Sequence, residues 1–240
     1  MFITFEGIKG AGKSLQASLL CVKLNEVYPY REVLYFSEPK GTALGQHVRS
    51  IKKDPEVELS PLQELLITAA ARSSAADEEI LPALLRGAIV ISDQFIDSTI
   101  AYFIHGLGMP EEQVRSIAKA STGSLTPDLT LFLDIEPDVA HMRLHRHKGS
   151  YYSSNVPGKD LLRKVNTGFA KILAENTSDR FRVIDGESSV NEIGTIAFSE
   201  VAQALEKSSH MSIDAVAREA KAGSAVLEKA AQVEKEDSEE

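Results

Sequence analysis

A glycine-rich stretch near the start of the chain constrains the fold more than any other feature. It follows an apolar run at Phe2–Phe5, precedes a helical pattern over residues 13–27, and matches GxxxxGK[ST] with the residues Gly7-Ile8-Lys9-Gly10-Ala11-Gly12-Lys13-Ser14. Glycines let the backbone curl around phosphate oxygens, and the positive end of the following helix attracts the same charge. A strand, this loop and a helix in that order indicate a P-loop that binds a nucleoside triphosphate.

Each position of the loop has an expected part in that binding. Lys13 is expected to reach the β- and γ-phosphates, and the Ser14 hydroxyl to ligate a magnesium ion that bridges them. The backbone N–H groups of the loop are expected to point at phosphate oxygens. The candidate ATP-binding residues here are Gly7, Gly10, Ala11, Gly12, Lys13, Ser14 and Leu15.

Short apolar runs recur along the chain between longer helical patterns. The runs are Phe2–Phe5, Val33–Phe36, Ala88–Ile91, Leu129–Leu133 and Phe181–Ile184, and the connecting segments include 13–27, 60–85, 97–120, 137–147, 159–175 and 189–206. Each segment is long enough for a crossover helix, and Ser60-Pro61 with Gln63 marks one helix start. The pattern predicts an α/β fold of three layers, a P-loop kinase fold with a five-stranded parallel sheet and helices on both faces.

Composition narrows the classes of function. The chain has 240 residues, 43% of them hydrophobic, which suits one large α/β domain. The net charge is −9 and there is no Lys/Arg-rich block, so we expect no nucleic-acid surface. No apolar run approaches the roughly 18 residues that span a bilayer. The single cysteine, Cys21, excludes a disulfide framework within the chain. We therefore expect a cytoplasmic protein, without a membrane segment, that acts on small-molecule nucleotides.

A second acidic residue is expected at the end of a core strand beside the P-loop, where it holds the metal directly or through water. Asp93 follows the run Ala88–Ser92 and is the favoured candidate, because ligands bind at the carboxyl ends of parallel strands. Its alternative role is to cap the following helix. Asp134, at the end of another run, is the competing candidate.

Several further segments, in order along the chain, carry a family resemblance. They are Phe2–Gly7, Ser37-Glu38-Pro39-Lys40-Gly41-Thr42, Ala70-Ala71-Arg72, Ser92-Asp93-Gln94-Phe95, Ser98–Tyr102 and Pro127–Asp134. Together with the P-loop they resemble the thymidylate kinases over residues 1–206. The resemblance implies a five-stranded sheet, phosphoryl transfer from ATP-Mg²⁺ to thymidylate, and a homodimer.

The resemblance also implies roles for single residues. Glu38, next to Pro39, is similar to the acidic residue near the acceptor phosphate and metal, and Arg72 to the arginine that binds the pyrimidine edge. Tyr102 resembles an aromatic residue near the deoxyribose or base, and Arg143 a lid arginine that contacts the donor nucleotide. The candidate acceptor-binding residues are Glu38, Pro39, Thr68, Arg72, Gln94, Ser98 and Tyr102.

The chain departs from the family pattern mainly on the acceptor side. Gln94 and Ser37 stand where the family has arginines, Thr68 where a phenylalanine stacks on thymine, and Phe103 where a glutamine follows the tyrosine. A glutamine cannot replace the planar, charged fork of an arginine on a phosphate. Lys9, where the family has an acid, offers a compensating cation. Its alternative role is that of a solvent-exposed loop lysine. The candidate catalytic residues are Lys13, Lys9, Asp93 and Glu38.

The organisation expected from these patterns is a kinase domain over residues 1–206, with a lid at about 145–158, and an extension over 207–240. The extension has apolar residues at helical spacing and ends in a charged stretch, which predicts a helix with an acidic disordered tail or, alternatively, a helix that docks on a partner. The functions that stay open at this point are a thymidylate kinase, a kinase for another nucleoside monophosphate and a catalytically weak nucleotide-binding module. A deoxynucleoside kinase is a weaker option, because it does not predict Glu38-Pro39 followed by Gly41-Thr42.

Overall fold

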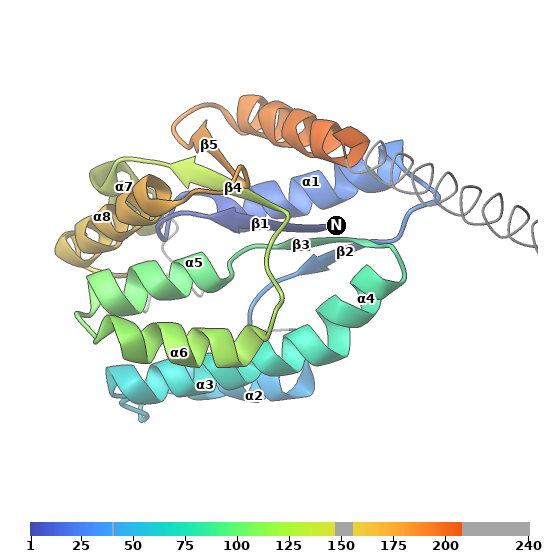
Figure 1. The fold of residues 1–240 in the computed structure, drawn as a ribbon. Helices are drawn as coiled ribbons and strands as arrows, with labels where there is room; N and C mark the ends of the chain where they lie inside the picture. Colours follow the sequence, from blue (N-terminus) through green and yellow to red (C-terminus); the bar gives the residue numbers. More distant parts are fainter. Residues whose placement is uncertain (40, 147–155, 208–240) are drawn as a thin grey trace, which may run out of the picture. The chain divides into compact units, whose positions relative to one another are not determined.

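The computed structural model describes residues 1–39, 41–146 and 156–207. Its centre is a five-stranded, all-parallel sheet in the order β2-β3-β1-β4-β5 (Figure 1). The strands are β1 (Phe2–Glu6), β2 (Val33–Phe36), β3 (Ile89–Ser92), β4 (Leu129–Asp134) and β5 (Phe181–Asp185). Each lies where an apolar run predicted a strand, within one residue at either end, so the predicted sheet is confirmed.

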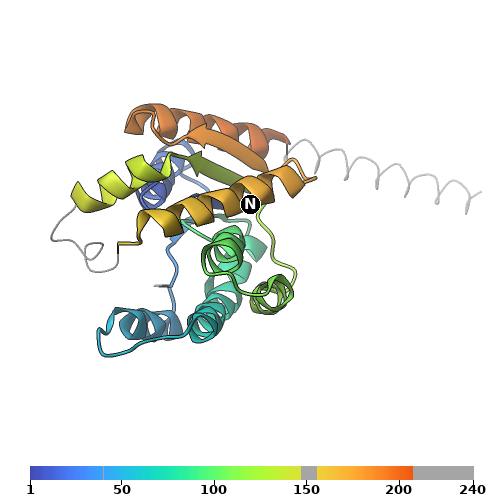
Figure 2. The same cartoon turned by 90° about the vertical axis from the view of Figure 1, so that its left-hand side faces the viewer.

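Helices cover both faces of this sheet, as predicted. Figure 1 shows α1 (Lys13–Val27) on one face, and α4 (Leu81–Leu85) and α5 (Ile96–Thr99) on the other. Below α5 in this view, and farther from the sheet, lie α2 (Ala43–Lys53), α3 (Pro61–Ala75) and α6 (Glu111–Thr122). The two views agree that α7 (Pro137–Arg146) and α8 (Lys159–Glu175) lie on the side of the carboxyl ends of the strands (Figure 2).

The hydrophobic core packs against both faces of the sheet. On one face, Phe2, Val90 and Phe95 pack with alanines of α3 and α4 and with Ile80 of the π-helical turn η1 (Ala76–Ile80). The rings of Phe2 and Phe95 meet edge to face at 4.9 Å. Burial on both faces explains why the strands are continuous apolar runs rather than alternating ones. The carboxyl ends of the strands are therefore fixed in place.

Local signals account for most helix boundaries. The predicted capping box is present at α3: Ser60 Oγ accepts from Gln63 N at 3.3 Å, and Gln63 Oε1 accepts from Ser60 N at 2.8 Å. The segment 97–120 is not one helix. It runs through α5 and the π-helical turn η2 (Ile100–Gly106), breaks, and restarts at α6 after Pro110, because Gly108 has φ +72° and proline cannot continue a helix. The helix α2, capped by Thr42, was not predicted.

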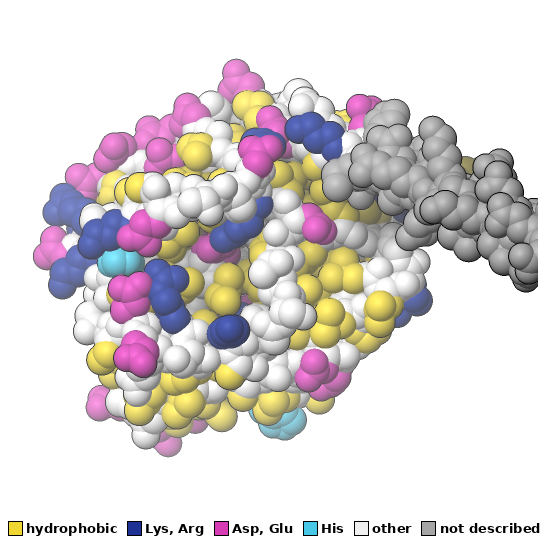
Figure 3. All heavy atoms as spheres, viewed as in Figure 1, with side chains coloured by type: hydrophobic (Ala, Val, Ile, Leu, Met, Phe, Trp, Pro, Cys, Tyr) yellow, Lys and Arg dark blue, Asp and Glu magenta, His cyan; other side chains and the backbone are white. Residues whose placement is uncertain are grey.

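The chain divides into two units, Met1–Phe198 and Ser199–Glu240. A last helix covers residues 190–207. Most of the predicted lid (145–158) and nearly all of the predicted extension (207–240) lie outside the described residues, so both stay predictions. None of the helices in the described part of the chain is both long and apolar enough to cross a bilayer. On the face shown in Figure 3, Lys and Arg side chains are interspersed with Asp and Glu.

Candidate functional site

The phosphate-binding loop is held open by contacts that only glycine permits. It leaves β1, turns through Gly10 at φ +96° and Gly12 at φ +98°, and enters α1 at Lys13. A Cβ on Gly10 would come within 2.6 Å of the carbonyl oxygen of Ala140 on α7. The loop is therefore seated against α7, and its backbone follows a path that L side chains rarely adopt.

Lys13 lies inside this loop rather than in solvent. Its ammonium donates to the carbonyl oxygens of Gly7 at 2.8 Å and Ile8 at 2.9 Å, and its side chain is buried. Burial lowers the pKa of Lys13 to about 8, an effect that the nearby Glu6 carboxylate opposes. A desolvated ammonium held by two neutral carbonyls gains charge pairing when an anion enters the loop.

The first turn of α1 presents its polar groups to the same space. Ser14 and Leu15 are exposed and Ala11 is buried, and no acidic side chain lies in the first turn of α1. The positive end of the helix dipole therefore lacks a side-chain carboxylate there. The structure thus brings together all the residues predicted to bind the triphosphate, with the exception of Arg143, which is described below.

Asp93 lies directly beyond β3, as predicted. Its carboxylate is buried and accepts at Oδ2 from Tyr35 Oη at 3.0 Å and from Ser37 Oγ at 3.1 Å. Ser37, at a position where an arginine was expected, therefore holds Asp93. The competing candidate, Asp134, is exposed at the end of β4.

Glu38 and Arg72 form a bidentate ion pair. Arg72 Nε donates to Glu38 Oε1 at 2.7 Å and Arg72 Nη2 to Glu38 Oε2 at 2.8 Å, and Nη2 also meets the carbonyl oxygen of Phe95 at 3.3 Å. The Arg72 side chain is 2% exposed and that of Glu38 10%. The Glu38–Pro39 peptide is cis, and α2 approaches the Pro39 carbonyl closely at Gly45, where a Cβ would clash. The pair therefore joins the loop after β2 to α3.

A buried acid that was not predicted as a site residue, Glu6, lies at the end of β1. Its carboxylate accepts from Phe95 N at 2.9 Å and from Ser98 Oγ. Burial, reinforced by the Asp97 carboxylate, raises the pKa of Glu6 to about 8. Asp97 is in turn held by Arg180, whose Nη1 and Nη2 donate at 2.8 and 2.7 Å. Ser98, expected to bind the acceptor, here binds Glu6.

A second group joins three helical elements around Thr68 and Tyr102, two of the predicted acceptor-binding residues, through Lys52 and Glu64, which were not predicted. Lys52 Nζ of α2 lies 2.9 Å from Glu64 Oε1 of α3 and donates to Thr68 Oγ1 at 3.4 Å. Tyr102 of η2 donates to Glu64 Oε2 at 3.4 Å. Burial and then Lys52 lower the pKa of Lys9, whereas Glu64 raises it. Lys9 of the P-loop therefore lies within electrostatic reach of this group.

Arg143 and Gln94 make backbone contacts. Arg143 Nη1 donates to the Gly186 carbonyl at 2.8 Å, which ties α7 to the turn after β5. The Gln94 carbonyl accepts from Ser92 Oγ at 2.6 Å, and the Gln94 side chain is half-buried. Arg143 thus lies on the helix that touches the P-loop, but its guanidinium is directed to β5 rather than to the loop.

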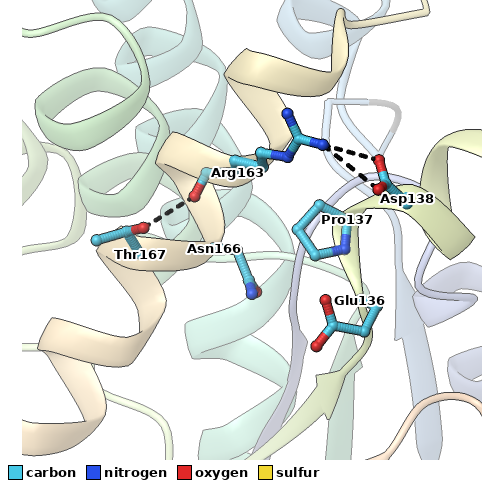
Figure 4. A pocket seen from close by; sticks show the side chains of 6 residues that line it. All are labelled: Glu136, Pro137, Asp138, Arg163, Asn166 and Thr167. Carbon is cyan, nitrogen blue, oxygen red and sulfur yellow. Dashed lines mark hydrogen bonds and ion pairs between the residues drawn. The ribbon is translucent and has the colours of Figure 1, made fainter.

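A hollow beside α7 is lined by residues that join α7 to α8. It is lined by Glu136, Pro137, Asp138, Arg163, Asn166 and Thr167 (Figure 4). Arg163 Nη2 lies 3.2 and 3.3 Å from the two Asp138 oxygens, and Lys159 Nζ 3.2 Å from one of them. These ion pairs join α7 to α8 and so support α7, the helix that contacts the P-loop.

Comparisons with known proteins agree with this geometry. The family model described as thymidylate kinase matches residues 5–195. The chain is 37% identical to a thymidylate kinase of Kosmotoga olearia over 210 residues, covering 88% of this chain and 99% of that one. It is also 37% identical to a thymidylate kinase of Chlorobium luteolum over 204 residues, covering 82% and 94%. The chain belongs to the thymidylate kinase family.

A solved structure supports the same assignment at the level of the fold. The thymidylate kinase from Ehrlichia chaffeensis superposes with a TM-score of 0.67 at 31% identity, covering 84% of this chain and 98% of that one. The resemblance recognised in the sequence is therefore confirmed. Within this thymidylate kinase fold, two of the positions that depart from the family pattern have identified partners: Ser37 binds Asp93, and Thr68 binds Lys52.

Proposed function

We propose that the chain transfers the γ-phosphoryl group of ATP to thymidylate, giving ADP and dTDP. An oxygen of the acceptor phosphate attacks the γ-phosphorus, a new O–P bond forms, and the bond from that phosphorus to the β–γ bridging oxygen breaks as ADP leaves. The observation that carries this proposal is the arrangement of Lys13 in the P-loop and the buried Glu38–Arg72 pair around the carboxyl ends of β1 and β3.

The donor half of the reaction rests on Lys13 and the first turn of α1. The ammonium would leave the carbonyls of Gly7 and Ile8 and meet the β- and γ-phosphates, a contact that strengthens as charge develops in the transition state. The backbone N–H groups of the loop would hold the same phosphates.

Magnesium fits the oxygen donors present here. Ser14 offers a hydroxyl and Asp93 a carboxylate whose two contacts are both made at Oδ2, and Mg²⁺ favours such hard oxygen ligands. Within the described residues no group of three or more His, Cys, Asp or Glu side chains is placed to hold a metal. Ser14 and Asp93 would therefore hold an ion whose other ligands are phosphate oxygens and water, and the ion would supply charge stabilisation at the transferring group.

The acceptor half rests on Glu38, Arg72, Lys9 and Tyr102. Arg72, fixed in direction by Glu38, would present its guanidinium to the acceptor base. Lys9 would supply a cation near the acceptor phosphate, in place of the arginines whose positions are taken by Ser37 and Gln94.

We also propose a homodimer, which the resemblance implies and which exposed Leu62 and Leu66 on α3 could help to form. The reaction draws on ATP and a nucleotide pool, so we place the enzyme in the cytoplasm.

The test is release of ADP with a panel of acceptors: dTMP, dUMP, dCMP, dGMP and AMP. We expect turnover to be greatest with dTMP, and Lys13→Ala to abolish it. If a different monophosphate is preferred, that compound is the acceptor in place of thymidylate. If no acceptor is turned over although calorimetry detects ATP binding, the kinase assignment fails and the chain is a nucleotide-binding module. That alternative is favoured by Ser37 and Gln94, which stand where the family pattern has arginines.

A further inference from the structure

The group formed by Lys52, Glu64, Thr68 and Tyr102 includes two of the residues predicted to bind the acceptor, Thr68 and Tyr102. Glu64, Thr68 and Arg72 follow one another at intervals of four residues on α3, so they share one face of that helix. Arg72 on this face contacts the loop after β2 through Glu38. The P-loop contributes Lys9, whose pKa responds to both Lys52 and Glu64. This face therefore carries Arg72, which is proposed to meet the acceptor base, and it lies within electrostatic range of the P-loop.

The group offers a ligand a hydrogen-bond donor, the ammonium of Lys52. Glu64 forms an ion pair with Lys52 and accepts from Tyr102, and Thr68 Oγ1 accepts from Lys52. A lysine ammonium has three N–H donors and no acceptor. An ammonium that meets Glu64 and Thr68 can use its third N–H for a ligand. The side chains of Lys52 and Glu64 are 31% and 22% exposed, so the pair is partly desolvated but open on one side.

We propose that Lys52 determines the base specificity of the acceptor site, by donating a hydrogen bond to a carbonyl oxygen of a pyrimidine-2,4-dione base. This inference rests on the proposed phosphorylation of a nucleoside monophosphate at the same site. Thymine and uracil carry a carbonyl oxygen at C4, where cytosine carries an amino group. That amino group cannot accept a hydrogen bond from an ammonium. Glu64 and Thr68 hold the ammonium in place, and Thr68 makes room for it where an aromatic ring would stack on the base.

The mechanism of selection follows from the cost of an unmet donor. A site built to hydrogen-bond a substrate group rejects the analogue that lacks the matching acceptor, because its own polar group is then left unpaired. A stacking ring selects poorly among pyrimidines, since each base has a similar face. Lys52 therefore replaces stacking with recognition of the base edge.

The test compares Lys52→Met with Lys53→Met in the full-length protein. Methionine keeps an unbranched side chain and removes the charge and the donors, and Lys53 is the exposed neighbouring lysine on the same helix. KM and kcat are measured for dTMP, dUMP and dCMP, with the melting temperature as the check on folding. Lys52→Met is expected to lower the ratio of kcat/KM for dTMP over dCMP at least tenfold and to leave the KM for ATP unchanged. Lys53→Met is expected to change neither.

A second variant guards against a purely structural effect. In Lys52→Gln the side-chain amide can accept as well as donate, so the preference is expected to shift toward dCMP, a change that loss of a helix–helix contact alone does not produce. Unchanged selectivity in both variants would show that Lys52 only joins α2 to α3. If the wild-type protein turns over no acceptor, the proposed function fails, and calorimetric binding of dTMP and dCMP to wild type and Lys52→Met still decides the role of Lys52.

Discussion

The two halves of the site are held by different forces. On the donor side, the P-loop is positioned by its own backbone: Lys13 bonds to Gly7 and Ile8, residues five and six positions away in the chain. On the acceptor side, the side chains are positioned by ion pairs between separate elements, such as Arg72 with Glu38 at a separation of 34 residues. In the proposed site, a local motif therefore carries the donor chemistry, and tertiary pairing carries the acceptor chemistry.

This difference has a consequence for stability. Lys13 is desolvated and faces neutral carbonyls, so burial of its charge destabilises the folded protein. The negative charge of bound ATP would offset this effect. Arg72 is equally buried but is matched by a carboxylate and a carbonyl. The donor side is thus arranged to gain charge pairing from its ligand, whereas the acceptor side is already paired before the acceptor arrives.

The largest effect is expected from Lys13→Ala. Removal of the ammonium from the transferring phosphates should lower kcat by on the order of 10³ or more. The melting temperature should stay within about 4 °C of wild type, because the variant also removes a desolvated charge. Steady-state ADP release and thermal unfolding measure the two quantities. A collapse of the melting temperature would contradict the idea that Lys13 serves the ligand rather than the fold.

The next effect is on stability, in Arg72→Met. It should lower the free energy of unfolding by about 3–5 kcal/mol, because the Glu38 carboxylate is then buried without its partner. Arg86→Met is the matched control, since Arg86 makes the same two-bond contact with Glu32, at 3.0 and 2.6 Å, on the exposed surface. It should have no measurable effect. Equal losses in denaturant unfolding of the two variants would contradict the distinction between buried and exposed pairs.

The sequence predicted what is written in contiguous residues. The P-loop, the five strands and the capping box at Ser60 are each encoded within a few neighbours, and each lies where it was expected. The break at Gly108 and Pro110 is marked by residue types that end helices, although the segment 97–120 was predicted as one crossover helix. The helix α2 was missed, although its N-cap, Thr42, is a residue type that marks helix starts.

The partners of polar side chains that are distant in the chain could not be predicted. Glu6 was assigned only to the start of the P-loop segment, yet it binds Ser98, 92 residues away, and feels the charge of Asp97. Glu38 and Arg72 were each assigned to the acceptor, but not to each other. Sequence gives the type of a side chain and its place on an element. Which carboxylate meets which cation depends on tertiary packing that a single sequence does not encode locally.

A smaller effect concerns pH and the boundary between the two halves, where Glu6 lies. Burial and Asp97 raise its pKa from an ordinary value of 4.5 to about 8, so the folded protein retains a proton that the unfolded chain releases. The stabilisation from Glu6 is therefore fully present below about pH 4.5 and is lost as the pH rises through about 8. The melting temperature of Glu6→Gln, which mimics the protonated form, should fall less between about pH 5 and pH 8 than that of wild type.

Lys13 provides the internal check on this assignment, because its ammonium favours the ionised form of Glu6. In Lys13→Ala the pKa of Glu6 should rise further, and the pH-dependent loss of stability should move to higher pH. Parallel pH profiles for wild type and Glu6→Gln would show instead that other groups set the pH dependence.

The smallest effect is expected from Ser60→Ala, at the start of α3. The variant removes one half of the capping box and should lower the free energy of unfolding by about 1 kcal/mol. Because α3 carries Arg72 and Thr68 but no residue of the P-loop, fraying of its first turn should leave the KM for ATP unchanged. Any kinetic change should appear in the KM for the acceptor, through Glu64 in that first turn. A rise in the KM for ATP alone would mean that the two halves of the site are coupled through α3, which would break the distinction between a locally built donor side and a tertiary acceptor side.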